Sequence, residues 1–110
     1  MALAHLVFIL LSLFSSYAQS ADLNWICQGK TRFIHRGAES TYPVDEQRRY
    51  QIQNQKLETM QCSTTENGWY CYGLTEQQAT RRIRLDTTTL TVSDTLELPT
   101  SALIFEGRCQ

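Results

Sequence analysis

The stretch CSTTENGWYC, Cys62 to Cys71, sets two cysteines on either side of a polar turn and decides the fold predicted for this chain. Thr65 to Gly68 are turn-forming residues, and Gly68 can adopt the positive φ that the last residue of a four-residue loop commonly needs. Such a loop places Cys62 directly opposite Cys71. Directly paired strands bring cysteine Cα atoms within about 4.4–6.8 Å, the range that a disulfide tolerates. The loop and the cysteines therefore predict the same hairpin, closed by a Cys62–Cys71 bridge.

A two-residue turn at Asn67 and Gly68 is the alternative, but it would set Cys62 opposite Gly73 and leave the bridge strained or absent. In the preferred register, period-2 alternation divides the hairpin into a core face and an outer face. The core face is predicted to carry Met60, Cys62, Trp69 and Cys71. The outer face is predicted to carry Thr59, Gln61, Ser63, Tyr70, Tyr72 and Leu74.

The first residues of the chain, MALAHLVFILLSLFSSYAQS, are typical of a secretory signal peptide cleaved after Ser20. The apolar run from Leu6 to Phe14 is short for a membrane span, which needs about 20 residues. An uncleaved anchor is the alternative. We therefore expect residues 21–110 to form a single exported domain, periplasmic or secreted, with no stable membrane insertion once the signal is removed.

The four cysteines compensate for the small size of this domain, in which core burial alone leaves stability marginal. Four cysteines allow three pairings, and we predict Cys62–Cys71 together with Cys27–Cys109, which would join the two ends of the domain. The cysteine spacing lacks any Cys-x-x-Cys and only His35 accompanies it after residue 20, so no metal or cofactor is predicted. The formal charge of −1 does not indicate a nucleic-acid partner.

The remaining segments predict further short strands, because apolar and polar residues alternate within them. The expected strands cover 23–35, broken or bulged near Gly29, then 48–53, 56–62, 81–86, 90–98 and 102–109. Residues 36–47 are expected to form the longest loop and 75–80 at most one helical turn, and Leu90 and Val92 are placed on one face. With the central hairpin, this gives six to eight strands of an all-β antiparallel meander, curled into a small barrel or sandwich.

The segment RRIRLDTTTLTVS, residues 81–93, followed by LIFEGRC, residues 103–109, resembles small disulfide-bridged exported bacterial β-proteins of uncharacterised function. The resemblance implies a fold and a compartment rather than an activity. The size, signal and bridges are also similar, by analogy only, to the small β-barrel inhibitors of c-type lysozyme.

No enzymatic activity is predicted, because acid–base or nucleophilic catalysis needs a base held near a partner and the domain offers His35 alone. The better candidate is a surface made by Tyr70, Tyr72, Arg82 and Arg84. If their strands are neighbours, these side chains share an outer face of residue types that are enriched at protein interfaces. Alternatively, the tyrosines merely favour a strand and the arginines merely keep the face soluble.

Two functions follow from these patterns. In the first, the chain is an exported binding or inhibitory module that engages another protein, such as an envelope or extracellular protein, or an anionic polymer through the surface of Tyr70, Tyr72, Arg82 and Arg84. In the second, it is a lipocalin-like carrier that encloses a small apolar ligand inside the barrel. A filled core with exposed Tyr70, Tyr72, Arg82 and Arg84 would favour the first, and an internal cavity would favour the second.

Overall fold

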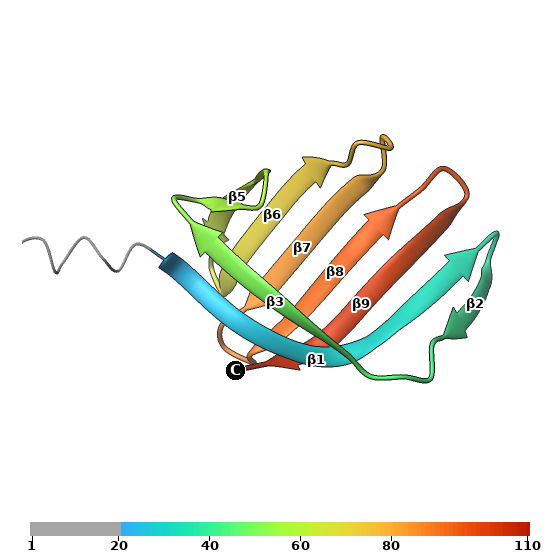
Figure 1. Cartoon of the computed structure of the whole chain (residues 1–110), viewed down its shortest axis with the longest axis horizontal. Helices are drawn as coiled ribbons and strands as arrows, with labels where there is room; N and C mark the ends of the chain where they lie inside the picture. Colours follow the sequence, from blue (N-terminus) through green and yellow to red (C-terminus); the bar gives the residue numbers. More distant parts are fainter. Residues whose placement is uncertain (1–20) are drawn as a thin grey trace, which may run out of the picture.

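The computed structural model describes residues 21–110, which form nine β-strands and no helix. The strands are β1 (Ala21–His35), β2 (Ala38–Thr41), β3 (Glu46–Gln53), β4 (Lys56–Leu57), β5 (Met60–Thr65), β6 (Gly68–Leu74), β7 (Thr80–Asp86), β8 (Thr91–Glu97) and β9 (Ser101–Cys109). Eight of them close an antiparallel barrel, and β2 adds one extra strand beside β1 (Figure 1). The predicted all-β meander is confirmed. The predicted signal peptide lies outside the described residues, among which no helix could cross a membrane.

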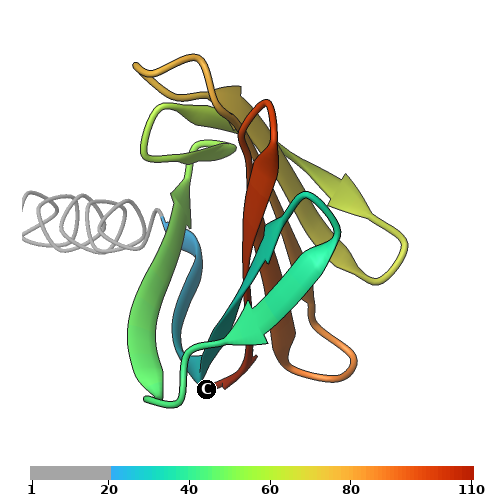
Figure 2. The ribbon, with the colours of Figure 1, turned by 90° about the vertical axis from the view of Figure 1, so that its right-hand side faces the viewer.

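Strand β1 closes the barrel because it pairs on both of its edges. Its first half pairs with β3, and its second half pairs with β9 from Cys27 opposite Cys109 to His35 opposite Ser101. Figure 1 shows β1 and β3 crossing in front of the wall formed by β6 to β9, and Figure 2 shows the same layers edge-on. The long curved strand β1 is therefore the strand at which the barrel closes.

The break predicted near Gly29 was wrong, because β1 runs through that position without interruption. Gly29 instead lies opposite Gly107 on β9. A Cβ atom at Gly107 would lie only 2.6 Å from the carbonyl oxygen of Gln28. The two glycines therefore allow β1 and β9 to approach closely at the point where β1 leaves β3.

The hairpin from Cys62 to Cys71 has the predicted register, with Cys62 opposite Cys71. The pair closest to the turn is Thr65 with Gly68, so the two central residues of the turn are Glu66 and Asn67. The positive φ expected at Gly68 is not found, since Gly37 is the glycine with a positive φ among the described residues. Gly68 is needed for another reason, because a Cβ there would collide with the carbonyl oxygen of Leu85 on β7.

Two segments differ from the predicted strands because tight turns interrupt them. The strand expected over 56–62 is divided into β4 and β5 by a turn at Glu58, whose φ is +55°. The long loop expected over 36–47 contains β2, which pairs with the end of β1. Local alternation could not reveal either feature, because each depends on which strand lies alongside.

Two smaller expectations concern turns. Residues 75–79 form a turn without a helix, which agrees with the expectation of at most one helical turn, and the amide of Thr75 donates to the carbonyl of Ala79. Leu90 does not share the face of Val92, because it lies in the β7–β8 turn with a φ of +56° and is exposed.

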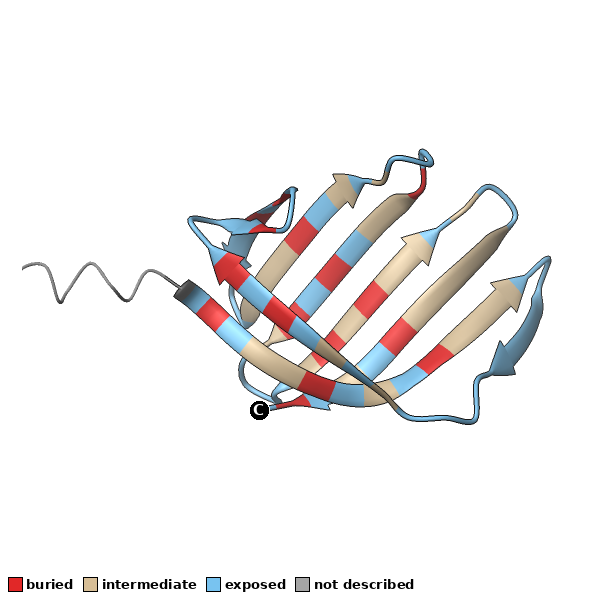
Figure 3. Ribbon diagram, viewed as in Figure 1, coloured by how far each residue is buried: buried red, intermediate tan, exposed pale blue. Residues whose placement is uncertain are grey.

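The core fills the barrel from the inward positions of every long strand. Buried and exposed positions alternate along β3, β5, β6 and β7 (Figure 3). The core residues are Leu23, Cys27, Tyr50, Ile52, Leu57, Met60, Cys62, Cys71, Ile83, Leu85, Val92, Phe105 and Cys109, with Trp25 and Trp69 packed against them. Both predicted disulfides are present inside this core, with Cα–Cα distances of 4.0 Å for Cys27–Cys109 and 4.1 Å for Cys62–Cys71.

Candidate functional site

The outer face of β6 and β7 brings the predicted tyrosines and arginines side by side. Tyr70 lies directly opposite Arg84, and Tyr72 lies directly opposite Arg82. Their strands are neighbours because a short turn returns the chain into β7, and the inward positions of Cys71 and Ile83 force these four side chains outward. Tyr72 is 46% exposed, both arginines are exposed, and Tyr70 is half-buried. We call Tyr70, Tyr72, Arg82 and Arg84 the Tyr/Arg face.

The two arginines of this face differ in their electrostatic environment. Arg82 forms an ion pair of 3.2 Å with Glu97 on β8. Arg84 makes no ion pair with any residue of the described chain; its guanidinium lies 5.8 Å from the ring centroid of Tyr70, within reach of a cation–π interaction. Arg84 therefore carries a positive charge that residues 21–110 do not neutralise by pairing.

A depression of about 370 Å³ adjoins Arg84 at the turn end of the face. We call it the Arg84 pocket; its lining comprises Thr65, Asn67, Trp69, Tyr70, Arg84, Leu85 and Asp86. Thr65, Gly68 and Asp86 are neighbours in one cross-strand row, and Gly68 stands between the other two. Because no side chain fills the middle of that row, the surface is hollowed beside Tyr70 and Arg84.

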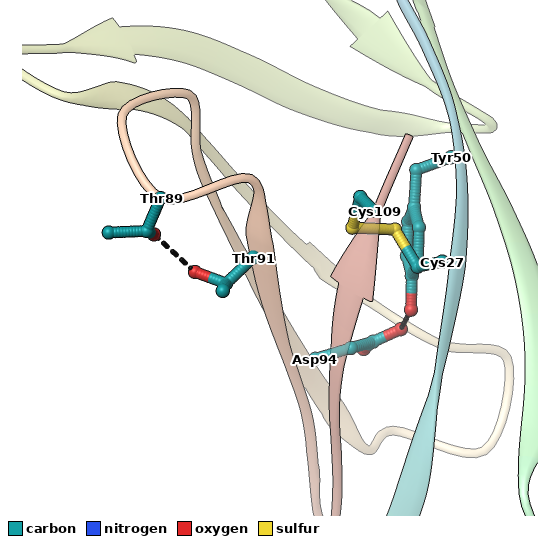
Figure 4. Close-up of a disulfide and its surroundings, with 6 residues drawn as sticks. All are labelled: Cys27, Tyr50, Thr89, Thr91, Asp94 and Cys109. Carbon is teal, nitrogen blue, oxygen red and sulfur yellow. Dashed lines mark hydrogen bonds between the residues drawn. A yellow bond between two sulfur atoms is a disulfide. The ribbon is translucent and has the colours of Figure 1, made fainter.

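A second cluster of charged groups lies inside the barrel and was not predicted. Its centre is Asp94 on β8, which is buried, with only 3% of its surface exposed. Arg81 donates two hydrogen bonds to its carboxylate, of 3.1 and 2.8 Å, Arg48 donates one of 3.3 Å, and the Tyr50 hydroxyl donates one of 2.8 Å. Figure 4 shows Tyr50 alongside the Cys27–Cys109 disulfide with its hydroxyl directed at Asp94.

Further carboxylates neutralise the two arginines of this cluster. Glu46 accepts 2.7 Å hydrogen bonds from Arg48 and from the Thr31 hydroxyl, and Glu58 pairs with Arg81 at 3.2 Å. The bond from Arg48 is the largest cause that holds the pKa of the Glu46 carboxyl below its usual value, with the bond from Thr31 next.

The same surroundings move the pKa of two other groups. Burial, followed by the nearby charge of Asp94, raises the pKa of Tyr50 well above its usual value, and hydrogen bonding to Asp94 raises that of Arg81. These contacts connect β3, β7 and β8, and each charged group of the cluster is paired with another charged group. The cluster therefore suits a structural role.

The sequence contained a signal for this inner cluster. Arg48 lies two residues before the buried Tyr50, Arg81 lies two residues before the buried Ile83, and Asp94 follows the buried Val92 at the same spacing. Alternation therefore places all three charged side chains on inward positions. Their opposite charges were the evidence that they could meet, but only the strand order shows that they do.

The remaining candidate groups are spread over the molecule. His35 lies exposed at the end of β1 and stacks on Phe33, with ring centroids 6.0 Å apart. All four cysteines are in disulfides, and the described residues contain no cluster of three or more metal-binding side chains.

Comparison of the chain with protein-family models, with curated proteins and with solved structures finds no match. The chemistry of the Tyr/Arg face is therefore inferred from its own geometry.

Proposed function

We propose that this chain is an exported binding or inhibitory module that contacts another protein through the Tyr/Arg face. The observation that carries the proposal is the cross-strand register on an outward surface, in which Tyr70 lies opposite Arg84 and Tyr72 lies opposite Arg82. Tyrosine and arginine are the side chains most often found among the residues that dominate binding energy at protein interfaces. Leu74, which is 68% exposed at the end of β6, extends the same surface with apolar area.

The rigidity of this surface supports the same proposal. Strands β6 and β7 each pair with a strand on both edges, and the Cys62–Cys71 bridge ties β6 to β5. A surface that is already ordered loses little conformational entropy on binding, so more of its contact energy contributes to affinity.

The interior of the barrel supports a surface binder over a carrier of an apolar ligand. The inward positions around both bridges are closely packed by the core residues. The polar cluster around Asp94 also lies within the barrel, where a carrier of an apolar ligand would need apolar walls.

The disulfides support an exported location. Both bridges are consistent with an oxidising compartment, and the signal expected over residues 1–20 would deliver the chain there. We therefore place the binding partner among envelope or extracellular proteins.

The proposal is tested by photo-crosslinking in the exported fraction of producing cells. A photoreactive phenylalanine derivative replaces Tyr72 in the working variant and Gln51, exposed on the outer side of β3, in the control. We expect a defined protein to be crosslinked from position 72 but not from position 51, and we expect a Tyr70→Ala substitution to reduce that product at least fivefold. Equal products from both positions, or none from position 72, would refute the proposal.

A further inference from the structure

We propose that the Arg84 pocket receives the carboxylate of an acidic side chain presented by the protein partner. This inference rests on the proposed function and specifies the chemistry of the partner at one point of the Tyr/Arg face. It is drawn from the charge of Arg84, from the position of its guanidinium near Tyr70 and from the pairing of the neighbouring Arg82.

The charge of Arg84 is the first observation. Two other arginines of the outer sheet surface, Arg82 and Arg32, are already engaged within the protein. Arg82 pairs with Glu97 at 3.2 Å, and Arg32 pairs with Glu39 and Glu106 at 2.7 Å each. Arg84 has no such partner in the part of the chain that the structure describes. Within the Tyr/Arg face, Arg84 is therefore the cation that pairs with no described residue, and an anionic group is its electrostatic complement.

The placement of the guanidinium is the second observation. The guanidinium carbon of Arg84 lies 5.8 Å from the centroid of the Tyr70 ring, so the two side chains lie together in the pocket lining. The N–H groups of a guanidinium lie along its edge and can form the paired, parallel hydrogen bonds that a carboxylate accepts. Thr65 and Asn67 add a hydroxyl and an amide to the lining.

Asp86 restricts where an anion can bind in this pocket. Its Oδ1 accepts hydrogen bonds of 2.8 and 3.0 Å from the amides of Thr88 and Thr89, so its carboxylate is tied to the β7–β8 turn. Repulsion from Asp86 disfavours an anion at that end and leaves the side next to Tyr70 and Arg84 as the place for the ligand.

A single acidic side chain fits this arrangement better than an anionic polymer. A polymer such as an acidic polysaccharide needs a row of unpaired cations, since its affinity comes from neutralising many charges together. Here the neighbouring cation Arg82 is neutralised by Glu97, the exposed Arg108 lies two strands away on β9, and Thr65, Asn67 and Tyr70 line the pocket beside Arg84. One acidic residue set among apolar and neutral groups of a protein surface matches this pattern.

The test is an NMR titration of the oxidised, isotope-labelled protein at low ionic strength. The probe is N-acetyl-glutamate N-methylamide, and its uncharged counterpart N-acetyl-glutamine N-methylamide is the matched control. We expect the acidic probe to shift the Arg84 Nε–H signal and the backbone amides of residues 65–70 with a millimolar dissociation constant. Arg84→Gln should weaken binding by about tenfold or more, as expected for loss of charge-assisted hydrogen bonds. Arg49→Gln, an exposed arginine on the outer side of β3, should leave it unchanged.

Several outcomes would overturn the inference. Equal shifts with the neutral probe, or binding that survives Arg84→Gln, would show that no carboxylate site exists there. Much tighter binding of polyglutamate, with a steep dependence on salt, would assign the surface to a polymer instead.

The result also separates this inference from the proposed function, because Tyr72 is not part of the pocket lining. Partner crosslinking at position 72 without binding of the acidic probe would refute the pocket and preserve the proposed function. Binding of the acidic probe without any crosslinked partner would refute the proposed function and preserve the carboxylate site.

Discussion

One buried carboxylate, that of Asp94, connects three strands through a single side chain. Its oxygens accept hydrogen bonds from Arg48 and Tyr50 on β3 and from Arg81 on β7. A buried charge is tolerated only when it is paired and hydrogen-bonded, and here every buried polar side-chain atom of the described residues has a partner. Replacing one member of such a cluster should therefore cost more than breaking an exposed pair.

The substitution Asp94→Asn tests this expectation, since it keeps the shape of the side chain and removes its charge. The half-buried Arg48 and Arg81 would lose their shared counterion, and we expect the free energy of unfolding to fall by about 2–4 kcal/mol. Urea unfolding at neutral pH measures this loss. The control is Glu97→Gln, which breaks the exposed pair with Arg82 and should cost less than about 1 kcal/mol. Equal losses in the two variants would contradict a stabilising role for Asp94.

The pairing of β6 with β7 depends on a backbone approach that only glycine permits. At Gly68 a Cβ atom would collide with the carbonyl oxygen of Leu85, which is backbone and cannot move without displacing β7. At Gly73, on the same strand, the nearest atoms belong to the flexible side chain of Met60. The two glycines of β6 therefore offer a matched comparison.

We expect Gly68→Ala to lower the free energy of unfolding by about 1–3 kcal/mol, because the added methyl group forces the two strands apart. Gly73→Ala should cost less, since Met60 can adopt another rotamer. Thermal unfolding followed by circular dichroism measures both effects. A Gly68→Ala protein as stable as the Gly73→Ala protein would show that β7 adjusts freely to β6.

Two disulfide bridges of very different span stabilise the whole molecule. Cys27–Cys109 joins residues 82 apart in sequence and fastens the first strand to the last, whereas Cys62–Cys71 joins residues 9 apart within one hairpin. In the chain-entropy account, the longer loop removes more freedom from the unfolded chain, with contributions of about 4.5 and about 2.7 kcal/mol respectively.

Removal of each bridge by a pair of Cys→Ala substitutions tests that difference at the scale of the domain. We expect loss of Cys27–Cys109 to destabilise the protein by about 2 kcal/mol more than loss of Cys62–Cys71. Denaturant unfolding under non-reducing conditions gives both values. Equal destabilisation would mean that strain or packing around the bridges, rather than loop length, governs their effect.

Much of this architecture followed from the order of residues alone. The Cys62–Cys71 register follows from the loop between the two cysteines. The inward positions of Cys62 and Cys71 and the outward positions of Tyr72 and Arg84 follow from an alternation with a period of two. That alternation is a local property of an extended backbone, so it can be read without knowing which strands are neighbours.

The tertiary structure alone decided how the strands meet. It divided 56–62 into two strands, placed β2 beside the end of β1, and used Gly68 for a close approach instead of a positive φ. It also brought Asp94 to Arg48 and Arg81 and left Arg84 without an ion pair among residues 21–110. Sequence determines which face each side chain takes, because that depends on adjacent residues. Contacts between distant residues depend on how the barrel closes, which no single segment specifies.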